Sequence, residues 1–321
     1  MLKALITGIT GQDGSYLAEL LLDKGYEVHG MVRRVALQDR RVRLARIVHL
    51  LDRITLHAGS VQDYGSVVRM VQGVQPDECY HLAAQSFVMD SFEDPHTTLD
   101  TNIVGTLNML MAMRDLVPKC KFYFAASSEM FGKVAESPQN ERTPFHPRSP
   151  YGVSKVAGYG LTRHFREAYG MFACSGILFN HESPRRGMEF VTRKITRGVA
   201  AIKAGRAKEL ALGNLDAKRD WGHSRDFVRA MWMMLQADQP DDYVVATGEM
   251  HSIKDFCRAA FGRVGLDWQK YVTVSDEFKR PSEVQELRGD ATKAKTVLGW
   301  KPQIRFFDLV AEMIDAEGGA A

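Results

Sequence analysis

The chain has 321 residues, of which 45% are hydrophobic and 25% charged, enough for a sizeable core in one large or two smaller domains. Its 42 basic and 39 acidic residues leave a net charge of +3, a balance that argues against a nucleic-acid-binding protein. No apolar run approaches the roughly 20 residues that cross a bilayer, so we expect no membrane-spanning segment.

The cysteines and the N-terminus indicate the compartment. Cys79, Cys120, Cys174 and Cys257 lie far apart and form no CxxC pair, which predicts neither a zinc site nor a disulfide framework. We therefore expect no bound metal. The first residues lead directly into a strand, without the longer apolar region of a signal peptide. We expect a reduced, cytoplasmic protein.

A glycine-rich turn follows the first predicted strand. Residues 2–7 form a short apolar run, GITGQDG occupies residues 8–14, and an amphipathic helix is predicted for 16–24. Such a turn lets backbone N–H groups and a helix N-terminus meet a pyrophosphate. The spacing is GxxGxxG rather than GxGxxG, and its place in the first strand–turn–helix favours dinucleotide binding over a plain tight turn.

The second predicted strand, residues 27–32, ends in Arg33 and Arg34. In a dinucleotide-binding fold this strand ends beside the adenosine ribose, where an acid accepts the 2′-hydroxyl and an arginine accommodates a 2′-phosphate. No acid stands here, so the sequence favours NADP over NAD. Four more arginines follow between residues 40 and 46, either as a solvated helix face or as a phosphate or subunit contact.

Strands and helices then alternate along the chain. Strands are predicted for 53–57, 78–82, 120–126 and 173–179, and helices for 64–71, 102–115 and 151–169. This alternation predicts an α/β fold with a Rossmann-like, doubly wound parallel sheet and helices on both faces. HLAAQS at 81–86 follows the fourth strand, and its small alanines would let the backbone lie against a cofactor.

Two pairs of polar residues follow the strand at 120–126. Tyr151 and Lys155 are four residues apart, so both side chains lie on one face of the predicted helix. An ammonium beside a phenol favours the phenolate, so we expect Lys155 to lower the pKa of Tyr151 and make it a base. Ser127 can hydrogen-bond a substrate hydroxyl, and Glu129 is a second, independent base.

Each pair also has a structural interpretation. A YxxxK pair is common on surface helices, and a serine followed by an acid is typical of a helix N-cap. Their position downstream of the glycine turn favours catalysis over both alternatives. Two bases suit a reaction with two proton transfers, which is more than a simple hydride transfer requires.

The pattern becomes less regular after residue 180. NHESPRRG at 180–187 and LGNLDAKRD at 212–220 carry several arginines and few apolar residues. Such loops suit a substrate that bears a diphosphate, although Arg185, Arg186 and Arg219 could also be ordinary surface residues.

Two regions are expected from these patterns. Residues 1–179 hold the strand–helix alternation and both polar pairs, and they are predicted to form the NADP-binding domain. Residues 180–321 are predicted to form a smaller C-terminal α/β substrate-binding region that completes a cleft, with room for the chain to cross back between the two.

The motifs resemble the extended short-chain dehydrogenase/reductase superfamily, through the glycine turn, HLAAQS, the Ser-x-Glu pair, YxxxK and GWKP at 299–302. Within it, the chain resembles the GDP-mannose 4,6-dehydratase family over nearly its whole length, and the stretches after residue 177 are specific to that family. The motifs that carry the likeness are GITGQDG (8–14), SSEMFG (127–132), PRSPYG (147–152), ILFNHESPRRG (177–187), FVTRK (190–194), GNLDAKRDWG (213–222), ATGE (246–249) and RPSEV (280–284).

This resemblance implies conversion of GDP-D-mannose, or a closely related GDP-sugar, to its 4-keto-6-deoxy form with tightly bound NADP. Oxidation at C4 acidifies the C5 proton, Glu129 removes it, water leaves from C6, and the same cofactor returns its hydride to C6. The net reaction is a dehydration, so the enzyme is a lyase. Ser127 stands where the family has a catalytic threonine, Tyr151 deprotonates the 4-hydroxyl, and Lys155 supports Tyr151 and the nicotinamide ribose.

The resemblance also implies the binding residues and the assembly. The family's basic loop reaches a neighbouring subunit, so we expect a homodimer or, preferably, a homotetramer. Contacts to the nucleotide sugar fall on Ser86, Asn180, Lys194, Arg219, Arg280 and Glu283. Cofactor contacts fall on Gly8, Ile9, Thr10, Gly11, Gln12, Asp13, Arg33, Arg34, Leu82, Ala83, Ala84, Gln85, Ser86, Tyr151, Lys155, His181 and Arg186.

Besides the serine at position 127, the chain departs from the family's pattern at a few positions, none of which is Glu129, Tyr151 or Lys155. Val35 and Ala36 stand where the family has serines near a 2′-phosphate, and Ser60 stands where many members have an aspartate for the adenine. Thr97 replaces an aromatic near the nicotinamide, and Gln285 replaces an acid. We therefore expect NADP to be preferred by a smaller margin than in members that keep the serines.

Other functions are compatible with parts of the pattern. A GDP-4-keto-6-deoxymannose reductase would use Tyr151 and Lys155 but consume NADPH, and NHESPRRG and LDAKRDWG favour the dehydratase instead. A GDP-sugar epimerase would typically lack Glu129, and a non-catalytic dinucleotide-binding regulator would lose the Tyr/Lys pair. The sequence does not distinguish mannose from a related GDP-linked heptose.

Overall fold

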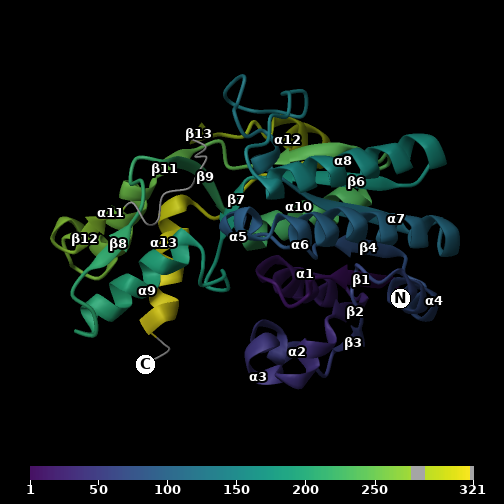
Figure 1. Cartoon of the computed structure of the whole chain (residues 1–321), viewed down its shortest axis with the longest axis horizontal. Helices are drawn as coiled ribbons and strands as arrows, with labels where there is room; N and C mark the ends of the chain where they lie inside the picture. The colour runs from purple at the N-terminus through teal and green to yellow at the C-terminus, as the bar shows by residue number, and fades with distance from the viewer. Residues whose placement is uncertain (276–285, 319–321) are drawn as a thin grey trace.

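A seven-stranded parallel sheet forms the larger of two regions in the computed structural model, which describes residues 1–275 and 286–318 (Figure 1). Its strands are β1 (Lys3–Thr7), β2 (Glu27–Val32), β3 (Ile54–Ala58), β4 (Glu78–His81), β5 (Lys121–Ser127), β6 (Ala173–Leu178) and β10 (Asp242–Val245). Their order in the sheet is β10-β6-β5-β4-β1-β2-β3. The chain adds β2 and β3 on one side of β1 and all later strands on the other side, so the switch point lies between β1 and β4. This topology confirms the predicted Rossmann-like, doubly wound fold.

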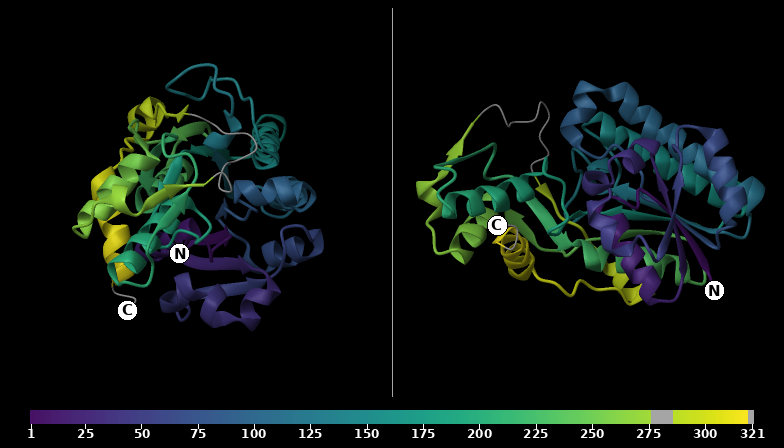
Figure 2. Two further views of the ribbon diagram at one scale, coloured as in Figure 1. Left: turned by 60° about the vertical axis from the view of Figure 1, so that its left-hand side comes forward. Right: turned by 90° about the horizontal axis from the view of Figure 1, so that it is seen from below.

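Alternating strand residues build one hydrophobic core on each face of the sheet, because successive side chains of a strand point to opposite sides. Ile6 and Tyr123 belong to one core, whereas Leu5, Phe122 and Phe124 belong to the other. In the right-hand view of Figure 2 the strands lie between the two layers of helices. The first core lies under α1 (Gln12–Asp23), α10 (Ser224–Gln236) and α12 (Thr292–Leu298), and the second under α4 (Tyr64–Val74), α7 (Gly105–Leu116) and α8 (Pro150–Tyr169).

Helix α1 begins four residues before the predicted start at Tyr16. Its first turn is polar and glycine-rich, so the apolar periodicity that predicts helices starts only later. Gly8 has φ of +76° and Gly11 is extended, which sends the chain directly into the helix at Gln12. The first helical turn therefore belongs to the glycine turn rather than to the core.

The second region lies on the left in Figure 1 and packs around its own apolar cluster, which includes Trp221, Phe256 and Phe306. A capping box between Ser252 and Asp255 starts its helix α11 (Ile253–Arg263). Its strands are β7 (Asn180–Glu182), β9 (Lys218–His223), β11 (Met250–Ser252) and β13 (Glu286–Leu287) in one sheet and β8 (Leu210–Leu212) and β12 (Val272–Val274) in another. Its helices are α9 (Val191–Lys203), α11 (Ile253–Arg263) and α13 (Phe306–Gly318).

The chain crosses back into the larger region after residue 180, because α10, β10 and α12 all pack on the seven-stranded sheet. Side chains cover the outer edge of its last strand. Glu141 accepts a hydrogen bond from the Val244 N–H at 2.7 Å, and Asp241 accepts one from the Asp242 N–H at 2.8 Å. Lys293 Nζ donates to the Asp242 carbonyl at 2.9 Å, so donors and acceptors along this edge have partners.

Short elements fill the connections between the main strands and helices. A π-helical turn, η2 (Asp100–Val104), precedes α7 where the sequence predicts one helix over 102–115. Within residues 1–275 and 286–318, no helix has both the length and the hydrophobicity needed to cross a membrane. The remaining elements are α2 (Arg34–Gln38), α3 (Arg40–Arg43), η1 (Ala45–Leu50), α5 (Val88–Glu93), α6 (Pro95–Leu99), η3 (Ser128–Met130) and η4 (Trp268–Lys270).

Candidate active site

A cavity, called here the first cavity, lies at the carboxyl ends of β1, β4, β5 and β6, where open α/β sheets bind their ligands. It brings both polar pairs together with most of the predicted cofactor residues. The predicted residues that line it are Gly8, Gly11, Gln12, Asp13, Leu82, Ala84, Ser86, Ser127, Glu129, Tyr151, Lys155, Asn180, His181 and Arg186.

The glycine turn forms part of the wall of the first cavity without side chains. A Cβ atom on Gly8 would lie 2.9 Å from the Ala83 nitrogen, and one on Gly14 would lie 2.3 Å from the Gly8 carbonyl oxygen. Gly8 also has a positive φ, which only glycine adopts readily. A larger residue at either position would displace backbone, so the turn keeps bare N–H groups at the helix N-terminus.

The HLAAQS segment is fixed against the end of β1. The Thr7 hydroxyl accepts hydrogen bonds from the N–H groups of Leu82 at 3.2 Å and Ala83 at 3.1 Å. It also bonds to Nδ1 of His81 at 2.8 Å, while Nε2 of His81 contacts the Thr106 hydroxyl at 3.1 Å. Burial lowers the pKa of His81 to about 3, so this imidazole is neutral and acts as a structural link.

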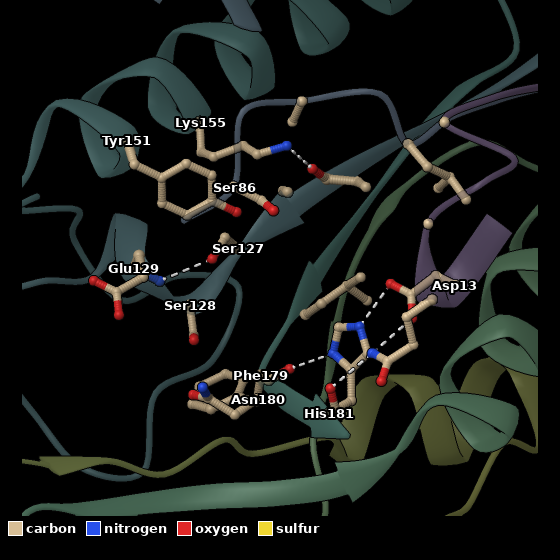
Figure 3. A pocket seen from close by; sticks show the side chains of 18 of the residues that line it. Asp13, Ser86, Ser127, Ser128, Glu129, Tyr151, Lys155, Phe179, Asn180 and His181 are labelled. Atoms are coloured by element: carbon tan, nitrogen blue, oxygen red, sulfur yellow. Dashed lines mark hydrogen bonds and ion pairs between the residues drawn. The ribbon is translucent and has the colours of Figure 1, made fainter. Parts of the chain in front are cut away.

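Helix α8 carries Tyr151 and Lys155 into the first cavity (Figure 3). Ser149 caps the helix by accepting from the Gly152 N–H at 3.0 Å, and Pro150 occupies the first helical position. Lys155 Nζ donates to the Ala125 carbonyl at 2.7 Å and lies 5.7 Å from the centre of the Tyr151 ring. The cap thus fixes the residue at which the helix begins, and from that start both side chains face the end of β5.

The prediction that Lys155 lowers the pKa of Tyr151 is wrong. Burial raises the pKa of Tyr151 to about 12, and a hydrogen bond with Ser127 opposes that rise. Burial also lowers the pKa of Lys155 to about 8. The ammonium is bound to the Ala125 carbonyl rather than to the phenol, so desolvation governs both groups.

Ser127 and Glu129 meet at the end of β5. Ser127 is the last residue of the strand and caps η3 by accepting from the Glu129 N–H at 3.2 Å. Both side chains also line the first cavity (Figure 3). The N-cap and the cavity position are therefore compatible, and the cap holds the Ser127 hydroxyl against the backbone of Glu129.

Asp13 and His181, both predicted as cofactor residues, bind each other. His181 Nε2 lies 2.7 Å from Asp13 Oδ2, and the Ser224 hydroxyl donates to Asp13 Oδ1 at 2.6 Å. Burial alone would raise the pKa of Asp13, but His181 and Ser224 lower it below its ordinary value. Burial alone would lower the pKa of His181, but Asp13 raises it. This ion pair joins the first turn of α1 to β7 beside the glycine turn.

A second cavity adjoins the first and contains the predicted substrate residues Asn180, Lys194 and Arg219. Asn180, Arg186 and Phe190 line both cavities. The second cavity otherwise lies between α9, β8 and β9 of the smaller region and the start of α5, with Phe87 and Met89, in the larger one. The predicted substrate residues Arg280 and Glu283 lie outside the described residues.

Several predicted cofactor residues do not line the first cavity. Arg33 and Arg34 are exposed at the start of α2, and Ile9 is buried in the core beneath the turn. Ser60, at the adenine position, donates its N–H to the Ser66 hydroxyl at 3.1 Å. The others outside the lining are Thr10, Ala83 and Gln85, all within the two backbone segments that border it.

Arg46 is the member of the basic segment that contacts this chain's own site. Its Nε donates to the Arg185 carbonyl at 2.7 Å and its guanidinium to the Thr10 carbonyl at 3.3 Å. It thereby ties the glycine turn to the NHESPRRG loop. Burial lowers the pKa of Arg46.

Some lining residues were not predicted as site residues. Ser128, Phe179 and Phe190 line the first cavity, and Glu182 lines the second. All four stand inside the motifs SSEMFG, ILFNHESPRRG or FVTRK, but no spacing rule singles them out. The motifs therefore indicated the segments that form the site, and only the fold shows which residues of each motif face a cavity.

The first cavity offers chemistry based on proton transfer. Tyr151, Glu129 and Lys155 are ionisable, and Ser127 can donate or accept a hydrogen bond. Among the residues the structure describes, no three His, Cys, Asp or Glu side chains come together as a metal site. The glycine turn beside these groups adds a cradle for a phosphorylated cofactor.

Comparison with protein families finds a match to the model described as "GDP-mannose 4,6 dehydratase" over residues 5–313. GDP-mannose 4,6 dehydratase 2 of Arabidopsis thaliana is 53% identical over 322 residues, 98% of this chain and 86% of the plant protein. GDP-mannose 4,6 dehydratase of Homo sapiens is 50% identical over 341 residues, 98% of this chain and 91% of the human protein. These likenesses span the residues that line both cavities.

Solved structures share the fold at lower identity. DesIV, a dTDP-glucose 4,6-dehydratase of Streptomyces venezuelae solved with NAD, has a TM-score of 0.85 at 23% identity, covering 99% of this chain and 97% of that one. RMD of Pseudomonas aeruginosa, solved with NADPH, has a TM-score of 0.84 at 24% identity and covers all of both chains. At this identity the likeness concerns the fold.

Proposed function

This chain belongs to the GDP-mannose 4,6-dehydratase family, and from that premise we propose that it converts GDP-mannose to GDP-4-keto-6-deoxymannose and water. One observation carries the proposal for this chain's own residues. Glu129 and Tyr151, two groups able to move protons, line the same cavity as the glycine turn. A dehydration through C4 oxidation needs one base at the 4-hydroxyl and another at C5.

The first cavity fits a nicotinamide dinucleotide, which structures of the same fold hold as NAD or NADPH. Gly8 and Gly14 let the turn pack closely against the backbone of Ala83 and against itself, because a Cβ at either position would collide there. A turn of this form presents its N–H groups to a pyrophosphate. When bound, the nicotinamide supplies a hydride acceptor and donor. We propose NADP specifically, with Arg33 and Arg34 at the exposed end of β2 placed to meet the 2′-phosphate.

Each catalytic side chain has a proposed task. Tyr151 takes the proton of the 4-hydroxyl, and Ser127 holds that oxygen by a hydrogen bond. Glu129 takes the proton from C5 and delivers it to the hydroxyl that leaves C6 as water. When C6 is reduced, C5 regains a proton, which in net terms is the one that Tyr151 removed from the 4-hydroxyl, so both side chains end each turnover as they began. Ser127 and Arg186 both act to lower the pKa of Tyr151, which favours the proton transfer that burial opposes.

The second cavity is the proposed site of the nucleotide part of the substrate. Lys194 and Arg219 provide cations suited to a diphosphate, and Asn180 stands where the two cavities meet. We propose that residues 1–179 mainly bind the cofactor and residues 180–321 mainly the substrate. Arg280 and Glu283 keep the substrate role that the resemblance implies.

We also propose a homotetramer or homodimer in the cytoplasm. Val104, at the end of η2, and Val153, on α8, are 38% and 47% exposed, and we propose that these apolar side chains lie in a subunit contact. The basic segment 33–46 supplies a second contact. The four cysteines are buried and unpaired, as suits a reducing compartment.

Incubation with GDP-mannose and a catalytic amount of NADP tests the activity. Mass spectrometry should find a GDP-sugar lighter by one water, formed in many-fold excess over the cofactor. Consumption of one NADPH per product would instead indicate a GDP-4-keto-6-deoxymannose reductase. If the chain does not convert GDP-mannose but does convert a GDP-heptose, the substrate assignment changes and the proposed dehydration mechanism stands.

A further inference from the structure

Glu182 is a buried carboxylate at the boundary of the two cavities that the proposed mechanism does not use. It is 2% exposed at the end of β7 and lines the second cavity but not the first. Burial raises the pKa of Glu182, while Arg186 and the Thr192 hydroxyl lower it. A buried carboxylate is costly unless it is paired, so its partners indicate what it stabilises.

Those partners orient one arginine. Glu182 Oε2 lies 3.0 Å from Nε of Arg186 and accepts a hydrogen bond from the Thr192 hydroxyl at 2.6 Å. On its other side the Arg186 guanidinium stacks 3.5 Å from the centre of the Phe190 ring. The contact with the carboxylate is an ion pair rather than a hydrogen bond, and together with the ring it favours this placement of the guanidinium.

Arg186 lines both cavities, and its side chain is 17% exposed. Its charge acts on Tyr151, Asp13 and His181 in the first cavity. A cation between two phosphorylated ligands attracts each of them and reduces their mutual repulsion. One fixed guanidinium can therefore serve both sites at once.

We propose that Glu182 is a positioning residue that holds Arg186 between the two cavities, so that the cofactor and the nucleotide sugar strengthen each other's binding. This inference rests on the proposed function, which assigns one ligand to each cavity. Glu182 itself acts through Arg186 and does not take part in the chemistry. Its removal should weaken the coupling between the ligands rather than only the stability of the fold.

Calorimetry with GDP as the probe tests this coupling. The dissociation constant of GDP is measured without NADP and with saturating NADP, and the ratio is the coupling factor. In Glu182→Gln, which keeps the size of the side chain and removes its charge, we expect the coupling factor to fall by about 5-fold or more. Glu141→Gln removes a carboxylate that lines neither cavity, and it should leave the factor unchanged.

A double-mutant cycle tests whether Glu182 acts through the arginine. Adding Glu182→Gln to Arg186→Gln should not lower the coupling factor further, because the residue to be positioned is already gone. A further fall, or an unchanged factor in Glu182→Gln alone, would overturn the inference. If Glu182→Gln does not fold, Thr192→Val should lower the factor in the same direction, and an unchanged factor there would overturn it equally.

The binding data also separate this inference from the proposed function. A wild-type chain that binds both ligands, with a coupling factor insensitive to Glu182, refutes the positioning role alone. A wild-type chain that binds NADP but not GDP refutes the proposed function, and the positioning role with it.

Discussion

Asp13 in α1 and His181 in β7 are 168 residues apart in the chain, yet their side chains form a hydrogen-bonded ion pair of 2.7 Å. The pair lies beside the glycine turn and is joined by Ser224 at the start of α10. One carboxylate thus holds together α1 and β7, which both line the first cavity, and α10, which does not. The pair should therefore be visible in the pH dependence of stability.

We expect His181→Gln to lower the free energy of unfolding by roughly 1–3 kcal/mol where both partners are charged. The pKa of His181 is raised above its ordinary 6.5, so its contribution is present below that value and is lost as the pH rises through the raised pKa. The pKa of Asp13 is lowered from 3.8, so its contribution is present above that value and is lost as the pH falls.

The difference between wild type and His181→Gln should accordingly be largest at about pH 4–6 and shrink toward alkaline pH. Denaturant unfolding at a series of pH values measures it. A difference that grew with pH would mean that the imidazole is neutral in the folded chain.

Glu129→Gln should reduce turnover of GDP-mannose by roughly 10²–10⁴-fold, because the proposed base at C5 is lost. Oxidation at C4 should still occur, so reduced nicotinamide should accumulate in a single-turnover absorbance measurement. Glu141→Gln is the matched control and should turn over at the wild-type rate. Turnover of Glu129→Gln within a few-fold of wild type would contradict the assignment.

Tyr151→Phe should abolish C4 oxidation, a loss of at least about 10²-fold, while leaving GDP-mannose binding nearly unchanged. The ring still fills its place among buried neighbours, and only the hydroxyl that meets Ser127 is removed. Parallel calorimetry and turnover measurements check this. Equal losses of binding and rate would show that the tyrosine is structural.

NADP should bind more tightly than NAD, and Arg34→Ala should weaken NADP by about 10-fold while changing NAD little. Arg34 is exposed at the start of α2 and offers a planar fork to a 2′-phosphate. Val35 and Ala36 cannot add hydrogen bonds there, so the margin should be modest. Equal affinities in wild type would assign the arginines to a subunit contact.

Light scattering at micromolar concentration should find a tetramer or dimer. Val153→Lys, which charges the exposed apolar surface of α8, should shift the distribution toward smaller species. A fully active wild-type monomer would contradict the proposed assembly. Asp308→Asn on α13 in the smaller region changes the net charge by the same one unit and is the control for charge.

The larger region could be predicted because its signal is periodic. Short apolar runs, alternating along the chain with helical patterns, predicted every strand of the seven-stranded sheet except β10. The helical patterns between these runs predicted the main helices that connect the strands. The family resemblance was also confirmed by relatives about half identical to this chain. In the smaller region, strands of two or three residues such as β7 and β13 are too short to show any periodicity.

The site was predictable where the chemistry follows local spacing. Tyr151 and Lys155 share a face because four residues make about one helical turn. The pKa of Tyr151 was not predictable, because burial raises it and because Lys155 donates instead to the carbonyl of Ala125, 30 residues away in the chain. The pairing of Asp13 with Ser224 likewise joins distant elements that no motif connects.

The covered edge of β10 constrains how copies of this chain can associate. An uncovered outer strand presents unpaired N–H and C=O groups to which another chain can add a strand. Here Glu141 and Asp241 engage the N–H groups of Val244 and Asp242, so strand addition at this edge would first have to displace charged side chains. Association of two chains through this edge is therefore disfavoured, and the same carboxylates guard it against edge-to-edge aggregation.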